Sequence, residues 1–308
     1  MLLTQLDRSL PSLRSVASVG SIRVLFVDDA SSEYLDPAHF TEPTSIDQVS
    51  VLRLKRNLSH QRAIAIGLAH LQREGRSDMV VVMDGDGEDR PPDVSALLTR
   101  CLQTNCTELV FAERAGRSEG GIFLFGYACY RIAHRLLVGR SMRVGNFSVV
   151  PRACLDRLVS VSELWNHYAA AVVAARIPNC QIPIDRGERI SGQSKMNLIS
   201  LVVHGLSAIS VQGEVVSVRV LFLLGILSCL LLVALAIVVG IRLGTDWAIP
   251  GWATSAVGFL ILALLQLLLI SVVMVILVLR GRSGLGFIPS RDHIHFVQAE
   301  EPLFKEPS

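Results

Sequence analysis

The chain has 308 residues, a net charge of +2 and an apolar content of 51%. So small a net charge gives no electrostatic reason to expect a nucleic-acid partner. The apolar content is high for a wholly soluble protein, and the excess lies towards the C-terminus, which predicts a soluble domain followed by membrane-spanning segments.

The N-terminal part is predicted to alternate helices and strands. In chain order the predicted elements are a helix at 2–13, strands at 22–27 and 49–54, a helix at 59–74, a strand at 79–83, a helix at 92–102 and a strand at 108–112. This alternation predicts an α/β domain with a doubly wound, mostly parallel sheet, and ligands of such sheets bind at the carboxyl ends of the strands. The first thirteen residues contain Asp7 and Arg8 and lack the continuous apolar run of a signal peptide. Six cysteines without a C-x-x-C pair agree with a reducing compartment and predict no disulfides.

An acidic segment follows the predicted strand at 79–83. Asp84 and Asp86 are hard oxygen ligands that suit Mg²⁺ or Mn²⁺ bound to phosphate oxygens. An EF-hand loop is disfavoured because its sixth and twelfth positions hold Asp89 and Ser95. A phosphatase-type aspartate nucleophile is disfavoured, because Thr or Val is expected two residues after the second aspartate and Glu88 occupies that position. Simple turn chemistry, in which Asp, Gly and Pro end a strand, stays open.

Two long segments near the C-terminus contain no charged residue. They are Val220–Ile241 and Trp247–Leu279, and each exceeds the roughly 20 residues that span a bilayer. The short loop between them predicts a hairpin whose two flanks lie on the same side of the membrane. Both flanks carry more Lys and Arg than the loop, so the flanks are expected in the cytoplasm.

The predicted organisation therefore has four parts. They are a cytoplasmic domain at 1–194, a juxtamembrane amphipathic helix at 195–218, two transmembrane helices within 219–282 and a cytoplasmic tail at 283–308. We expect an integral protein of the plasma or inner membrane. Gly225 and Gly240 permit close approach of neighbouring hairpins, which leaves a homo-oligomer open.

Five segments, in order, resemble the family-2 glycosyltransferases. These segments are residues 27–32, 56–68, 83–89, 145–150 and 186–195. Together with the hairpin, they resemble more closely the polyprenyl-phosphate glycosyltransferases that are similar to dolichol-phosphate mannose synthase. The resemblance implies a GT-A-like fold and a metal-dependent, inverting transfer of a sugar from a nucleotide-sugar to a polyprenyl phosphate, undecaprenyl or dolichyl. Mg²⁺ or Mn²⁺ is the implied cofactor.

The resemblance also implies roles for residues that match its motifs on the donor side. Asp29, with Asp28 as its neighbour, is expected to contact the base or ribose of the nucleotide. Asn57, His60 and Gln61 are expected to border the nucleotide, although a solvated helix start explains this stretch equally well. Asp84 is expected to contact the sugar.

A second group of residues is expected to act on the diphosphate and on the acceptor. Asp84 and Asp86 would hold the metal ion, and Asp86, Arg186, Arg189 and Lys195 would carry catalysis. Arg189 and Lys195 would orient the acceptor phosphate. A cluster of basic residues that simply marks the cytoplasmic side of the membrane is the alternative interpretation of these three cations.

One departure from the family concerns the first strand. Family members usually begin with a strand at the centre of the sheet, whereas this chain starts at the helix that should follow it. We expect either a start upstream of Met1 or a truncated, catalytically weak paralogue that acts as a binding or assembly partner. A different acceptor also stays open. A processive polysaccharide synthase is disfavoured because the chain has no Gln-x-x-Arg-Trp motif and too few membrane helices.

Overall fold

The computed structural model describes residues 2–16, 19–33, 35, 37–114, 144–184, 210–211, 213–245, 251–283 and 286–304. The chain forms two compact units. The first consists of Met1–Gly121, Met142–Val211 and Gly286–Ser308, and the second of Ile122–Ser141 and Gln212–Leu285.

The first unit begins with helices and strands close to where the sequence predicts them. They are α1 (Leu2–Val16), β1 (Arg23–Asp28), β2 (Gln48–Leu54), α2 (His60–Glu74), β3 (Met79–Val82), α3 (Val94–Gln103) and β4 (Leu109–Arg114). Further along follow β5 (Val144–Pro151), α5 (Arg152–Leu158), α6 (Tyr168–Ala174), β6 (Asn179–Ile184), α10 (Pro289–Asp292) and β7 (Val297–Pro302). Short 3₁₀ helices lie at Pro37–His39, Pro91–Asp93, Ser162–Trp165 and His293–His295.

These strands form two sheets. One has the order β1-β2-β7 and the other the order β3-β5-β4-β6. The pairs β1/β2 and β4/β6 are parallel, whereas β2/β7, β3/β5 and β4/β5 are antiparallel. The α/β fold class is confirmed: most strands of each sheet run in one direction, and the sheets are mixed because β5 and β7 run against their neighbours.

The division between the sheets falls between β1 and β3, each of which lies at the edge of its sheet. The two sheets nevertheless share one apolar core, to which β1 contributes Val24 and Phe26 and β3 contributes Met79 and Val81.

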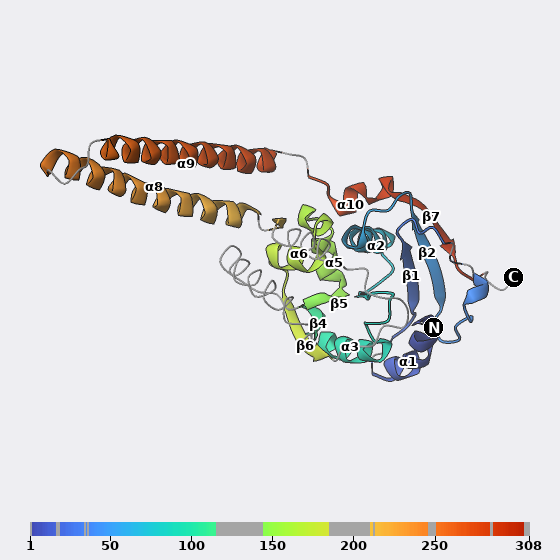
Figure 1. Cartoon of the computed structure of the whole chain (residues 1–308). Helices are drawn as coiled ribbons and strands as arrows, with labels where there is room; N and C mark the ends of the chain where they lie inside the picture. Colours follow the sequence, from blue (N-terminus) through green and yellow to red (C-terminus); the bar gives the residue numbers. More distant parts are fainter. Residues whose placement is uncertain are drawn as a thin grey trace. The chain divides into compact units, whose positions relative to one another are not determined.

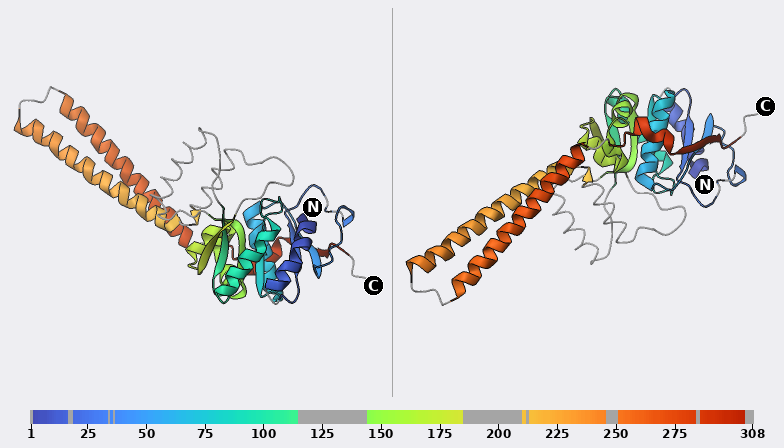
Figure 2. Two further views of the ribbon diagram at one scale, coloured as in Figure 1. Left: turned by 90° about the horizontal axis from the view of Figure 1, so that it is seen from below. Right: turned by 90° about the horizontal axis from the view of Figure 1, so that it is seen from above.

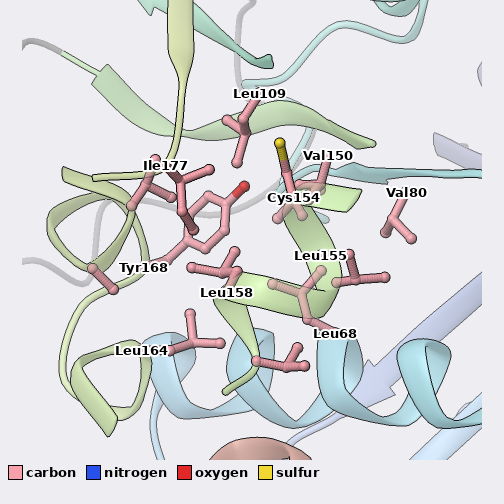
Figure 3. Close-up of a cluster of buried hydrophobic side chains, with 14 of the residues drawn as sticks. Leu68, Val80, Leu109, Val150, Cys154, Leu155, Leu158, Leu164, Tyr168 and Ile177 are labelled. Atoms are coloured by element: carbon pink, nitrogen blue, oxygen red, sulfur yellow. The ribbon is translucent and has the colours of Figure 1, made fainter. Parts of the chain in front are cut away.

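Helices cover both faces of the strands (Figure 1). Helices α2, α5 and α6 share one apolar cluster with β3, β4 and β5, while α1 and α3 pack against the opposite side. Tyr168 lies in the first cluster beside Leu158 and Ile177 (Figure 3). Its hydroxyl is 2.7 Å from the Ser148 hydroxyl, and burial raises the pKa of Tyr168. The hydroxyl therefore stays protonated and satisfied within the core.

Helix α2 approaches β1 closely at Gly67. A Cβ atom at this position would lie 2.8 Å from Cγ2 of Val27. The absence of a side chain at Gly67 thus fixes how near α2, which carries residues of the candidate site, can lie to β1.

The segment after the hairpin folds onto the first unit, where the sequence predicts only a tail. Strand β7 pairs with β2, and the backbone N–H of Lys55 donates to the carbonyl of Phe296 at 2.9 Å. The rings of Phe287 and Phe296 pack on Trp165, with centroids 3.8 and 5.3 Å away. Residues 286–304 are therefore part of the fold of this unit.

The second unit contains two helices of 32 residues each, α8 (Gly213–Gly244) and α9 (Trp252–Ser283). They run side by side in opposite directions (Figures 1 and 2), and both are long and apolar enough to cross a membrane. Their apolar side chains are largely exposed, which suits a lipid environment rather than a soluble core. The predicted hairpin is confirmed. Most of the predicted juxtamembrane helix at 195–218 lies outside the described residues, and 213–218 form the first turns of α8.

Candidate active site at the strand ends

The acidic segment after β3 forms a turn that is tied together internally. The carboxylate of Asp89, with 1% of its surface exposed, accepts the backbone N–H of Asp84 at 2.7 Å. Asp86 Oδ1 accepts the N–H of Glu88 at 3.0 Å. These bonds fix the loop at the end of β3, where the side chains of Asp84 and Asp86 are partly exposed.

His60 at the start of α2 lies against this turn. Its Nε2 is 3.2 Å from Asp84 Oδ1 and 2.8 Å from the amide nitrogen of Asn146. The hydrogen bond to Asp84 raises the pKa of His60; burial opposes this, and the charges of Asp84, Asp86 and Asp89 add to it. When protonated, Nε2 donates to Asp84. When neutral, it can accept from Asn146.

Gln61, which the sequence predicts to border the nucleotide, lies inside the fold. It is buried, its amide nitrogen donates to Asn146 Oδ1 at 3.1 Å, and its carbonyl oxygen accepts the N–H of Tyr168 at 2.7 Å. These bonds join the start of α2 to β5 and α6. Its predicted contact with a nucleotide stays a prediction.

The second acidic pair lies at the end of β1. Asp29 Oδ1 accepts the N–H of Leu58 at 2.7 Å, and Asn57 Oδ1 accepts the N–H of Ser59 at 3.2 Å. The short stretch from Asn57 to His60 is therefore held by Asp29 at one end and meets Asp84 at the other. The structure thus links the two acidic groups that the sequence placed at separate strand ends.

Asp28 makes a different set of contacts from Asp29. It is buried, its Oδ1 accepts the N–H of Ser31 at 3.0 Å, and its Oδ2 accepts from Arg53 Nη1 at 3.1 Å. The sequence predicts that Asp28 lies beside the nucleotide. In the structure both of its carboxylate oxygens accept hydrogen bonds from within the protein.

A divalent cation fits the acidic turn after β3. Asp84 and Asp86 supply carboxylate oxygens, the donors that Mg²⁺ and Mn²⁺ prefer. His60 lies 3.2 Å from Asp84 Oδ1, so a cation bound at this turn would share Asp84 with His60. The assignment of Asp84 and Asp86 as metal ligands stays a prediction.

Among the described side chains, three potential metal ligands also meet away from this turn. The ligand atoms of His70, Glu74 and Glu300 lie within 4.8 Å of one another. They are already paired, because His70 Nε2 is 2.9 Å from Glu300 Oε2 and Glu74 forms an ion pair with Arg23. The positive charge of Arg23 at this place opposes a further cation, and ion pairing accounts for the cluster.

The predicted catalytic residues Arg186, Arg189 and Lys195 lie outside the described residues. Sequence reasoning left His60 undecided and did not single out Asn146. The one available signal for Asn146 was its place in the segment 145–150 that carries the family resemblance.

The strand-end carboxylates lie in an α/β domain, and such domains bind their ligands at the carboxyl ends of the strands. Residues 4–147 match the family model described as glycosyl transferase family 2. The chain accordingly carries a glycosyltransferase family 2 domain, and the protein is a glycosyltransferase.

Several similar proteins align with most of the chain. The uncharacterized glycosyltransferase YkoT of Bacillus subtilis is 26% identical over 258 residues, which are 82% of this chain and 74% of YkoT. The undecaprenyl-phosphate 4-deoxy-4-formamido-L-arabinose transferases of Erwinia tasmaniensis and Edwardsiella ictaluri are 27% and 25% identical. They cover 80% and 77% of this chain, which spans 77% and 74% of their own lengths.

A solved structure of CMP:2-keto-3-deoxy-manno-octonic acid synthetase with CTP matches with 12% identity and a TM-score of 0.37. The match covers 67% of this chain and 88% of the synthetase. A likeness this distant supports no conclusion about activity.

Proposed function

We propose that this glycosyltransferase moves a sugar from a nucleotide-sugar to a polyprenyl phosphate at the cytoplasmic face of the membrane. The observation that carries the proposal is the acidic strand-end site, in which Asp29 and Asp84 are linked through residues 57–60, on a chain that also carries a membrane hairpin. A soluble donor and a membrane-bound acceptor need both features.

The donor side follows from the acidic residues. We assign to Asp29, which follows β1, hydrogen bonds from the ribose or base; Asp84 follows β3 and lies beside His60. Asp84 and Asp86 would hold Mg²⁺ or Mn²⁺, which when bound supplies positive charge to the diphosphate. His60 keeps Asp84 oriented through the contact at 3.2 Å.

The proposed reaction is a direct displacement at the anomeric carbon. An oxygen of the acceptor phosphate forms the new bond to that carbon, and the bond to the nucleoside diphosphate breaks with its electron pair leaving on the diphosphate. The lipid phosphate is already an anion at neutral pH, so a general base is less necessary than for a sugar hydroxyl. Positive charge near the leaving group stabilises the developing anion. This course inverts the anomeric configuration.

The acceptor side rests on the membrane hairpin and on the relatives. The chain leaves the first unit after Val211 and re-enters it at Gly286, so one unit is attached to both ends of the hairpin. Two similar proteins are named as undecaprenyl-phosphate transferases. Arg186, Arg189 and Lys195 precede the hairpin in sequence, and we assign to them the orientation of the acceptor phosphate.

The test uses membranes that contain the full chain, supplied with undecaprenyl or dolichyl phosphate, Mg²⁺ or Mn²⁺ and a panel of labelled nucleotide-sugars. Label is counted after extraction into organic solvent. Asp86→Asn should lower the rate at least about 100-fold, the order expected for losing electrostatic stabilisation of a transition state. Asp156→Asn is the matched control, because Asp156 is a partly exposed carboxylate on α5 that pairs with Arg152.

Lipid-extractable label from one donor, lost in Asp86→Asn but not in Asp156→Asn, supports the proposal. Retention of the anomeric configuration in the product contradicts the displacement mechanism. Label on a non-lipid product indicates another acceptor. The separation of the strands into two sheets is the observation behind a second candidate, a weakly catalytic binding or assembly partner. Absence of transfer with every donor and acceptor would support that candidate.

A further inference from the structure

The C-terminal strand reaches the donor side of the candidate site through one arginine. Arg53 on β2 donates from Nε to Glu301 Oε2 on β7 at 3.1 Å and from Nη1 to Asp28 Oδ2 on β1 at 3.1 Å. Asp28 and Arg53 are directly opposite each other in the parallel pairing of β1 and β2. One guanidinium therefore connects all three strands of this sheet.

Burial decreases from Asp28 through Arg53 to Glu301. The side chain of Asp28 is 5% exposed, that of Arg53 is 13% exposed and that of Glu301 is 47% exposed. Burying a carboxylate is costly unless a cation and hydrogen bonds accompany it, and Arg53 supplies both to Asp28. Arg53 in turn has a flexible side chain, whose direction is fixed by the second carboxylate at Glu301.

Asp28 also holds the turn that follows β1. Its other oxygen, Oδ1, accepts the N–H of Ser31, which closes a side-chain turn over the two intervening residues. Ala30 within this turn has φ 53°, a left-handed conformation that non-glycine residues rarely adopt without support. Asp29 lies in the same turn, so the direction of its carboxylate depends on how well the turn is held.

We infer that Glu301 and Arg53 are positioning residues for the donor side of the site: β7 holds Arg53 on Asp28, and Asp28 holds the turn that presents Asp29. In this assignment Asp29 contacts the nucleotide and Asp28 supports it. The segment after the membrane hairpin thereby completes the nucleotide side of the site. The inference rests on the proposed function only where its test measures transfer from the donor.

The neighbouring residue on β7 offers a matched control. Glu300 bonds to Ser50 at 2.8 Å and lies 2.9 Å from Nε2 of His70 on α2. Because successive side chains of a strand point to opposite faces, Glu300 anchors β7 on the side of α2, whereas Glu301 faces Arg53. Replacing Glu300 loosens β7 without touching the contact to Arg53.

The experiment compares Glu301→Gln, Glu300→Gln and Arg53→Gln in the full-length protein in detergent. One readout is the hydrogen-exchange rate of the Ser31 amide, which needs no substrate. The second is steady-state transfer with the donor that labels lipid. Glu301→Gln removes a partly exposed ion pair, so we expect it to speed Ser31 exchange about fivefold. KM for the donor should rise by a similar factor, while kcat stays within about twofold of the parent protein. Arg53→Gln should give a larger effect in the same direction.

Glu300→Gln should leave both the Ser31 amide and the donor KM within about twofold of the parent protein. Equal effects of the two glutamate variants would overturn the inference, because general loosening of β7 would then explain them. Unchanged Ser31 exchange in both Glu301→Gln and Arg53→Gln would also overturn it. If no donor is transferred at all, the proposed function fails while the exchange of Ser31 still decides the positioning role.

Discussion

Removing the indole of Trp165 should release the C-terminal segment from the rest of its unit. Trp165 lies between Phe287 and Phe296, whose ring centroids are 3.8 and 5.3 Å from its own. The guanidinium carbon of Arg62 lies 5.0 Å from the indole centroid on the side of α2. Trp165 thus joins α2 to residues on both sides of α10.

The magnitude follows from the two ring pairs. An aromatic pair contributes about 0.5–1.5 kcal/mol beyond the area it buries. Two pairs give about 2 kcal/mol for the docking of residues 286–304, and 1.4 kcal/mol corresponds to a factor of ten in an equilibrium constant. The Trp165→Ala variant should therefore raise the population of undocked β7 by about 30-fold. Trp165→Phe keeps a ring in place and should raise it less than about fivefold.

Hydrogen exchange of the full-length protein in detergent measures this population directly. The amides of β7 that bond to β2 exchange through undocking, so their rates report its free energy. Amides of β4 and β5 serve as the internal reference, because they lie in the other sheet. Exchange in β7 that stays within twofold of the parent protein in Trp165→Ala would refute the reasoning.

Three further predictions concern α2. Ser59 has φ 75° and ψ 157°, a region occupied mainly by glycine, and its side chain makes no cap hydrogen bond. In denaturant titrations Ser59→Gly should therefore raise the free energy of unfolding by about 1 kcal/mol. A loss of stability would contradict this prediction. Gly67→Ala should lower the free energy of unfolding by about 1–3 kcal/mol, because its Cβ would lie 2.8 Å from Val27. Combined with Val27→Ala, it should lower it by less than the sum of the two single changes, which a double-mutant cycle measures. The raised pKa of His60 means that its ion pair with Asp84 is complete below about pH 6.5 and is lost as the pH rises through the raised value. The melting-temperature advantage of the parent protein over His60→Gln should therefore shrink from pH 6 to pH 9, and an advantage that grows would contradict the assignment.

Features that depend on neighbouring residues in the chain could be predicted from the sequence. The spacing of apolar residues predicted α1, α2 and the strands up to β4, and long uncharged segments predicted the hairpin. The carboxylates at the ends of β1 and β3 followed from the same reasoning. Local patterns suffice here because helix and strand periodicity, and the length that spans a bilayer, are properties of contiguous residues.

Other features required the tertiary structure, because they depend on residues far apart in the chain. The sequence did not predict β7, which pairs with β2 across more than two hundred residues, nor the antiparallel direction of β5. Nor did it predict the hydrogen bonds that join Gln61 to Asn146 and Tyr168. The contacts of Arg53 with Asp28 and Glu301 likewise come only from the tertiary structure. Strand order and the partners of buried polar groups are set by packing, in which each buried donor or acceptor must find a partner wherever the chain brings one.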